Sequence, residues 1–271
     1  MRRSGSRRSP WLKVHMGITF AFLYLPLVVL VALSFNDAQR AVVSWRGFTT
    51  RWYGEVFDNT ESLGALATTL VIATIATTIS VGLGTLLALG LERYTRSATL
   101  DSAVYFPLLV PDIVTGIALL SFYSLIGLPL GTGSIVLAHS VWGIAFAAAI
   151  VRTRLRGFDR SMEEASLDLG VKEVPTFFRI TLPIITPGVV SAALVVFTLS
   201  VDEFVIAYFT AGRTVTFPIQ VYSMIRFGVT PEINAVATIL LVFSMLLIFG
   251  ALYLNRGRAK DDHRTSEEAP A

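Results

Sequence analysis

Three carboxylates lie in segments of this sequence that are otherwise almost free of charge. Asp112 lies within one apolar stretch, and Asp202 and Glu203 are neighbours in another. An ionised carboxylate inside a bilayer is costly unless it faces water, a partner group or a cation. Because no Lys or Arg lies within the same stretches, we expect these acids to line a route for a small cationic substrate. For Asp112 the alternative is that it caps a helix that is broken beside Pro111.

Other chemistries find little support in the sequence. His139 is the only histidine in the middle of the chain, there is no cysteine, and no nucleophile motif accompanies this imidazole. An intramembrane enzyme needs a nucleophile and a base within reach, and a metal site needs several ligands close together. There is no G-x-x-x-x-G-K-[ST] phosphate loop for ATP. We therefore expect no catalytic residue, bound metal or cofactor in this chain, and no nucleic-acid partner.

The distribution of charge indicates an all-α polytopic membrane protein. Hydrophobic residues make up 54% of the chain, and charged residues make up 15%. A helix needs about 20 apolar residues to cross ~30 Å of hydrocarbon, and it satisfies its own backbone hydrogen bonds. The turn-forming sequence GLPLGTGS divides one uncharged stretch that is too long for a single helix. The six predicted transmembrane helices are residues 15–34, 63–91, 103–126, 135–151, 185–210 and 233–254.

Two further patterns concern these spans. Small residues recur every four positions in the second span, at Ala76, Ser80, Gly84 and Ala88, which predicts close packing between helices of this chain.

The first 35 residues also have the basic start and apolar run of a signal peptide. That apolar run is long, and no small-x-small cleavage site follows it, so we expect an uncleaved first span.

The positions of Lys and Arg predict the orientation. If the amino terminus is inside, 17 of these residues lie in inside segments and 5 in outside segments. Positive charge gathers in cytoplasmic loops, so we expect both termini in the cytoplasm. The predicted organisation is a basic amino-terminal segment (1–14), a transmembrane domain (15–254) with a cytoplasmic loop (152–183), and a flexible cytoplasmic tail (255–271).

The cytoplasmic loop is predicted to contain two short helices. Ser161 and Glu164 have the spacing of an S-x-x-E capping box at a helix start. Gly170 is placed to end that helix in a left-handed conformation. Pro175 suits the first turn of a second helix, which we expect to stop near Pro183 because proline disfavours helical geometry in the preceding residue.

The loop also resembles a known family. Its spacing reads Glu164-Ala165-Ser166, three residues, Gly170, nine residues, and then Ile180-x-Leu182-Pro183. This pattern resembles the EAA loop of ABC importer permeases, with Ser166 where the family usually has a similarly small alanine. The resemblance implies a type I importer permease fold in which this loop docks on a cytoplasmic ATPase. The residues to which it assigns coupling are Glu164, Ala165, Ser166, Gly170, Ile180, Leu182 and Pro183.

The resemblance also implies partners. An importer of this kind would combine the chain with a second permease subunit, which can be identical or different. A dimer of cytoplasmic ABC ATPases would bind ATP and Mg²⁺, and a periplasmic or extracellular solute-binding protein would deliver the substrate. The expected location is the bacterial inner membrane.

Longer stretches indicate a substrate class. LSVDEFVIAYFTAG (199–212), PDIVTGIALL (111–120) and the segment 222–247 resemble the second permease subunit of spermidine/putrescine-type importers. A different small solute, such as a phosphonate, a metal complex or an amino-acid derivative, remains the alternative within this family. An autonomous secondary transporter is a second alternative, but the inverted repeats that such proteins often carry are not visible in the sequence.

Overall fold

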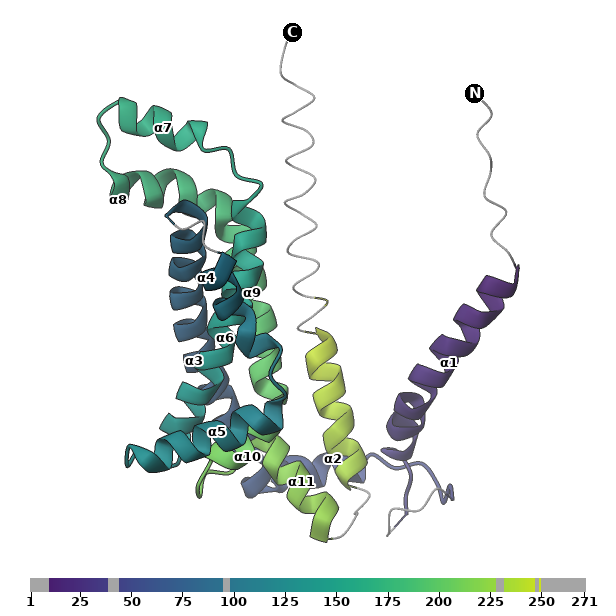
Figure 1. Ribbon diagram of the computed structural model, residues 1–271. Coiled ribbons are helices and arrows are strands. Elements are labelled where there is room, and N and C mark those ends of the chain that lie inside the picture. The colour runs from purple at the N-terminus through teal and green to yellow at the C-terminus, as the bar shows by residue number, and fades with distance from the viewer. Residues whose placement is uncertain (1–9, 39–43, 95–97, 228–231, 247–248, 250–271) are drawn as a thin grey trace. The chain divides into compact units, whose positions relative to one another are not determined.

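A computed structural model describes residues 10–38, 44–94, 98–227, 232–246 and 249 (Figure 1). Every regular element within these residues is a helix, apart from an isolated bridge between Asn36 and Phe48. The all-α prediction is therefore confirmed. The chain divides into two compact units, residues 1–63 with 221–243 and residues 64–220 with 244–271.

The first unit contains a long apolar helix and a polar turn that follows it. Helix α1 spans Pro10–Leu33 and α2 spans Arg51–Asp58. Asn36 organises the segment between them, because its side chain donates to the Ser44 carbonyl oxygen at 3.0 Å and accepts from the Arg46 amide at 2.8 Å. The indole of Trp52 donates to the Asn36 carbonyl oxygen at 2.9 Å.

The second unit is built from three long helices and several shorter ones, and its buried apolar residues form separate clusters. Its elements are α3 (Thr60–Arg93, whose first four residues belong to the first unit), α4 (Ala98–Tyr105), a 3-10 turn (Phe106–Leu108), α5 (Asp112–Leu125), α6 (Thr132–Leu155), α7 (Ser161–Asp168), α8 (Glu173–Thr176), a π turn (Phe177–Thr181), α9 (Leu182–Asp202), α10 (Val205–Thr210) and α11 (Phe217–Phe227), which continues into the first unit.

The described helices account for part of the predicted span count. Four of them are long and apolar enough to cross a membrane, namely Trp11–Leu33, Thr60–Arg93, Thr132–Leu155 and Glu173–Asp202, and a bent pair could make a fifth. The sixth predicted span overlaps a described helix at Glu232–Leu246, and most of its remaining residues lie outside the described part. The count of six stays a prediction.

Small residues bring α3, α6 and α9 together. A Cβ atom built on Gly84 of α3 would lie 2.6 Å from the Cβ of Ala147 of α6, and one on Gly143 would lie 2.4 Å from the Ser80 hydroxyl oxygen. The core around these contacts is composed of Ala88, Leu89, Ala147, Ala148, Val151, Leu155, Ile185, Ala192 and Val196. In lipid, helices are held together by packing, and the close approach of neighbouring helix backbones makes this packing possible.

The third predicted span is not a straight helix. Helix α4 ends at Tyr105, and α5 begins at Asp112 after a bend of 104°. Pro111 is the N-cap of α5 with an extended ψ of 138°, and a residue that precedes proline disfavours helical geometry. The sequence places Pro107 and Pro111 at this bend, where proline is a known cause of helix breaks.

The fifth predicted span is also broken, so the prediction of one helix over 185–210 is wrong. Helix α9 ends at Asp202, Glu203 is extended with ψ 114°, and α10 begins at Val205. The Glu203 carboxylate accepts a hydrogen bond from the Ile206 amide at 2.8 Å, which satisfies one of the free amides at the new helix start. A local carboxylate–backbone contact therefore stabilises the restart of the helix at this break.

The two short helices after these breaks pack against each other. Gly116 of α5 lies so close to α10 that a Cβ atom there would be 2.8 Å from the Phe209 ring. In Figure 1, α5 and α10 lie together at the end of the second unit that is opposite α7. The starts of both helices therefore belong to one local structure.

The α3–α6 packing yields a stability prediction. Gly84→Ala would insert a methyl group into a contact of 2.6 Å, and overpacking costs about 1–3 kcal/mol. We expect the melting temperature of the detergent-solubilised protein to fall by about 5 °C. Gly90→Ala is the matched control, because no atom lies within 4 Å of that position and alanine favours helix. Equal melting temperatures of the two variants would contradict the packing.

Candidate functional site

The predicted loop forms two short helices around a glycine turn. Gly170 has φ +81°, in the left-handed region, as the sequence predicts. The Gly170 amide donates to the Leu167 carbonyl oxygen at 2.8 Å, and the Val171 amide donates to the Ser166 carbonyl oxygen at 3.2 Å. These paired bonds form a Schellman motif, which reverses the chain so that α8 runs back beside α7.

The start of α7 differs from the prediction. Arg160, and not Ser161, is the N-cap residue, and no side-chain cap bond forms there, so the predicted capping box is wrong. Ser161 is already the first helical residue, and its amide donates to the Asp159 carboxylate at 3.0 Å. Hydrogen bonds from the Ser161 backbone and side chain favour the ionised carboxylate and lower the pKa of Asp159.

The second loop helix continues into the membrane helix, so the prediction that it stops near Pro183 is wrong. Pro175 lies in the first turn of α8 as predicted, but a π turn at Phe177–Thr181 joins α8 to α9. The Leu182 amide bonds to the Phe177 carbonyl oxygen. A π turn holds one extra residue, and Pro183 follows it directly as the second residue of α9.

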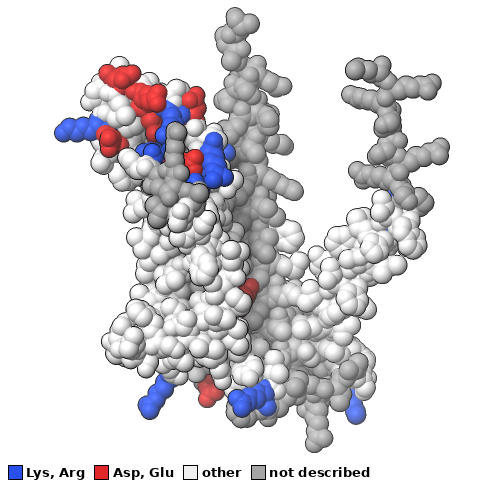
Figure 2. All heavy atoms as spheres, viewed as in Figure 1, with Lys and Arg blue, Asp and Glu red and all other residues white. Residues whose placement is uncertain are grey.

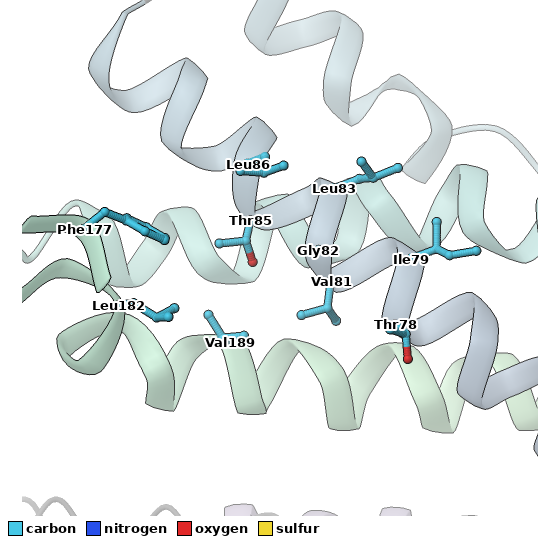
Figure 3. Close-up of a pocket in the computed structure, with 10 residues that line it drawn as sticks. All are labelled: Thr78, Ile79, Val81, Gly82, Leu83, Thr85, Leu86, Phe177, Leu182 and Val189. Carbon is cyan, nitrogen blue, oxygen red and sulfur yellow. The ribbon is translucent and has the colours of Figure 1, made fainter. Parts of the chain in front are cut away.

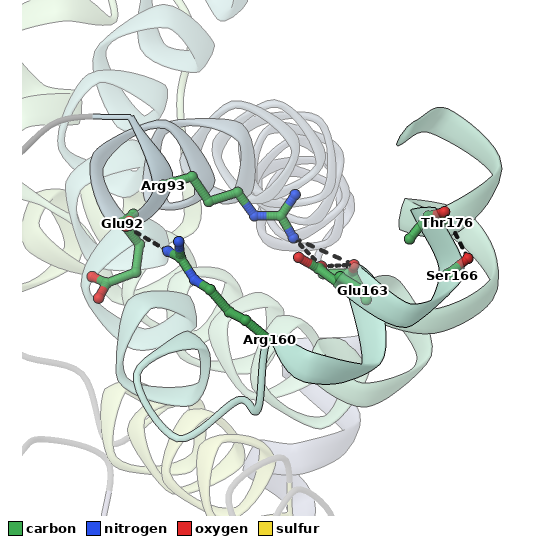
Figure 4. Close-up of polar contacts among 7 residues, drawn as sticks. Glu92, Arg93, Arg160, Glu163, Ser166 and Thr176 are labelled. Atoms are coloured by element: carbon green, nitrogen blue, oxygen red, sulfur yellow. Dashed lines mark hydrogen bonds and ion pairs between the residues drawn. The ribbon is translucent and has the colours of Figure 1, made fainter. Parts of the chain in front are cut away.

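One carboxylate fixes the loop to the helix bundle. Glu163 of α7 forms an ion pair with Arg93 in the last turn of α3 (Figure 4). It also accepts a hydrogen bond from the Thr181 hydroxyl. The Glu163 and Arg93 side chains are 13% and 24% exposed, so water screens the pair only in part. A second contact joins the two loop helices, since the Ser166 and Thr176 hydroxyls lie 2.9 Å apart.

Glu163 is not among the residues that the sequence pattern assigns to coupling. Glu164, the predicted residue from the same first turn, is exposed. Neighbouring residues point about 100° apart on a helix, so only one of the two carboxylates faces the bundle. The sequence signal that could have identified Glu163 is Arg93. This cation lies at the end of an uncharged span, where it needs an acidic partner.

The opposite face of the loop is free. Of the predicted coupling residues, the exposed ones are Glu164, Ala165, Gly170 and Pro183, and the half-buried ones are Ser166, Ile180 and Leu182. Large apolar side chains accompany them: Leu169 is 85% exposed, Val174 66% and Phe178 60%. Figure 2 shows charged side chains gathered around α7 and α8, whereas the bodies of α3, α6 and α9 are nearly bare of charge. Apolar groups ringed by charge are typical of a binding surface.

An apolar groove lies at the base of the loop. It has a volume of about 630 Å³ and runs between α3 and the first turns of α9 (Figure 3). Leu86 and Val81 line it on one side, and Phe177, Leu182 and Val189 line it on the other. The packing of α9 against α3 is therefore open near the loop, in contrast to the close contact of α3 with α6.

The three predicted pathway acids lie at the helix breaks. Asp112 is the first residue of α5 and is exposed, and Asp202 is the last residue of α9 and is also exposed. Glu203 is half-buried and caps α10. Asp112 and Glu203 thus lie at the starts of two helices that pack against each other, and the carboxylates of Asp112 and Asp202 are accessible. The first-turn position of Asp112 also suits the alternative, a carboxylate at a helix start.

His139 is a packing residue in this structure. Its side chain is 2% exposed, and Nδ1 lies 2.7 Å from the Ser200 hydroxyl oxygen of α9. Among the residues that the structure describes, no group of three or more His, Cys, Asp or Glu side chains could hold a metal ion.

Comparison with known proteins gives consistent matches. Residues 80–259 match the family described as "Binding-protein-dependent transport system inner membrane component". The chain is 40% identical to the "Putrescine transport system permease protein PotI" of Escherichia coli (strain K12), over 97% of this chain and 96% of that protein. It is 37% identical to the "Spermidine/putrescine transport system permease protein PotC" of the same organism, over 90% and 94%.

Solved structures with low sequence identity share the fold. A bacterial ABC transporter involved in the import of the acidic polysaccharide alginate aligns with a TM-score of 0.68 at 15% identity, covering 93% of this chain and 98% of that one. The inward-facing MetNI methionine ABC transporter aligns with a TM-score of 0.60 at 18% identity, covering 78% and 99%.

The anchoring of α7 yields a second prediction. Glu163→Ala removes the partner of Arg93 and of the Thr181 hydroxyl, and loss of such a charged hydrogen bond costs about 1.5–3 kcal/mol. We expect amide hydrogen exchange in α7 and the Gly170 turn to become at least about tenfold faster. Glu164→Ala is the control, because that side chain is exposed. Equal exchange rates in the two variants would contradict the anchoring role.

Proposed function

Because this chain belongs to the family of binding-protein-dependent transport system inner membrane components, we propose that it is a permease subunit of an ATP-driven polyamine importer. In this proposal it forms the translocation pathway together with a second permease subunit. A dimer of cytoplasmic ABC ATPases binds ATP and Mg²⁺, and a solute-binding protein delivers the substrate. Both termini and the α7–α8 loop face the cytoplasm of a bacterium, in agreement with the excess of Lys and Arg in those segments.

The two-sided arrangement of α7 carries the coupling part of the proposal. Its outer face presents Glu164, Ala165 and exposed apolar neighbours to a partner. Its inner face is tied to α3 through Arg93 and to the π turn through Thr181. A displacement of α7 by the ATPase is therefore passed to two helices of the membrane bundle at once.

The substrate class rests on the relatives and on the acids. The curated relatives named above are putrescine and spermidine/putrescine permease proteins. Polyamines carry several positive charges at neutral pH, and Asp112 and Asp202 offer exposed carboxylates at helix breaks. Within the membrane such groups are costly unless they meet a cation or water.

Transport in a defined system tests the proposal. The chain, its second permease and its ATPase are reconstituted in proteoliposomes with the binding protein, and uptake of radiolabelled putrescine and spermidine is measured with and without ATP. We expect ATP-dependent uptake that unlabelled polyamine competes away. Uptake without the ATPase would favour the secondary transporter, and ATP-dependent uptake of only a phosphonate, a metal complex or an amino-acid derivative would overturn the polyamine assignment.

The Gly170 turn yields a prediction about coupling. A left-handed φ strains a β-branched residue, whereas asparagine tolerates it. We expect Gly170→Val to distort the end of α7, so that ATP hydrolysis continues while uptake falls about tenfold or more. Gly170→Asn is the control and should retain most of the uptake, since nothing lies within 4 Å of a Cβ atom at this position. Wild-type uptake by the valine variant would contradict a role of this turn in coupling.

The exposed acid at the end of α9 yields a prediction about the pathway. Asp202→Asn removes a charge that we expect to face the cationic substrate, so polyamine uptake should fall about tenfold while the complex still assembles. Asp58→Asn, at the exposed end of α2, is the control for loss of one carboxylate. Unchanged uptake by the Asp202 variant in proteoliposomes would count against its place in the pathway.

A further inference from the structure

The last turn of α3 carries two neighbouring residues of opposite charge that contact different elements. Arg93 pairs with Glu163 of α7, as described above. Glu92 accepts from Arg152 of α6 at 2.8 Å, and Arg156 lies 3.7 Å from the same carboxylate oxygen. The end of α3 is therefore tied both to the coupling loop and to α6.

The coupling loop also reaches Glu92 directly. Arg160, the residue before α7, donates to the Glu92 backbone carbonyl oxygen at 2.7 Å (Figure 4). A movement of α7 therefore acts on both residues of the α3 end, on Arg93 through an ion pair and on Glu92 through its backbone. The hydrogen bond from Arg160 therefore connects the coupling loop to the residue that pairs with Arg152.

Arg152 passes the contact on to a third element. Its side chain is only 8% exposed, and a buried guanidinium needs several partners to offset its desolvation. Besides Glu92, it donates to the Tyr105 hydroxyl at 3.3 Å. The same buried cation therefore joins Glu92 of α3 to Tyr105.

Tyr105 lies at the point where the third span bends. It is the last residue of α4, and it is followed by the 3-10 turn and the 104° bend to α5. Asp112 is the first residue beyond that bend. Helix α5 is held to α10 by the close contact at Gly116, so a change of angle at the bend moves the starts of both helices.

From these contacts we infer that Tyr105 is a positioning residue, whose hydrogen bond to Arg152 transmits the movement of the coupling loop to the α4–α5 bend and so changes the accessibility of the start of α5. This inference rests on the proposed function, because it assumes that an ATPase moves α7. It assigns to Tyr105 a role that no feature of the sequence indicates.

Cysteine accessibility tests the inference. The chain has no cysteine, so Ile113→Cys, at a 54% exposed position beside Asp112, introduces a single thiol. The complete complex is labelled with a maleimide, with and without ATP and vanadate, and the modified peptide of this chain is quantified. In the parent we expect ATP to change the labelling rate by about tenfold, the effect of a population shift of about 1.4 kcal/mol.

The decisive variant is Tyr105→Phe, which removes only the hydroxyl group and leaves Arg152 paired with Glu92. We expect it to reduce the ATP-dependent change in labelling to less than about twofold and to lower the polyamine imported per ATP hydrolysed, while ATP hydrolysis continues. Tyr94→Phe is the control, since this tyrosine follows Arg93 and is 79% exposed. It should keep the parent's response.

Each outcome decides the question. An ATP-dependent change that persists in Tyr105→Phe, or is lost equally in Tyr94→Phe, overturns the inference, and so does a parent in which ATP changes nothing at the introduced thiol. Polyamine uptake by the parent is measured separately. If ATP alters labelling in the parent and Tyr105→Phe suppresses that change, but no polyamine is imported, the substrate proposal fails while the role of Tyr105 stands.

Discussion

The polar contacts at the end of α3 are the constraint on which the arrangement of the loop depends. Long apolar helices can pack in many registers, because contacts between aliphatic side chains have little directionality. Ion pairs with partly buried members are directional and are costly to leave incomplete. Glu92 and Arg93 need partners from α6 and α7, so their pairs fix where the loop lies relative to α3 and α6.

The helix breaks matter because they place polar groups where a continuous helix would not. An unbroken helix satisfies its own backbone and presents only side chains. At Pro111 and Glu203 the helices stop and restart, so the carboxylates of Asp112 and Glu203 and the first amides of α5 and α10 lie within otherwise apolar segments. Irregular backbone of this kind is tolerated only where it is buried in protein or lines a water-filled cavity. In the proposed importer, the acids assigned to the substrate pathway lie at these breaks.

Sequence reasoning succeeded where the signal was local or periodic. The all-helical class followed from the apolar runs, the close α3–α6 packing from the small residues, and the left-handed turn from Gly170. The break at Glu203 could not be predicted, because no Gly or Pro marks it within the apolar run. Pro183 was misleading, since the rule that proline ends a helix leaves out the π turn that accommodates it. The role of Glu163 could not be predicted, because its partner Arg93 lies 70 residues away in the sequence. The sequence alone does not show which face of α7 lies against Arg93.

The π turn between α8 and α9 has a geometric consequence. It holds one residue more than an α-helical turn, and each residue of an α-helix rotates the chain by about 100° and advances it by about 1.5 Å. If Phe177–Thr181 tightened to α geometry, α8 would rotate about the helix axis by about that angle. It would also move along the axis relative to α9, and the helix would stay continuous. At this π turn, a rotation of the loop is therefore linked to an axial shift of the membrane helix, because the pitch of the helix relates the two movements.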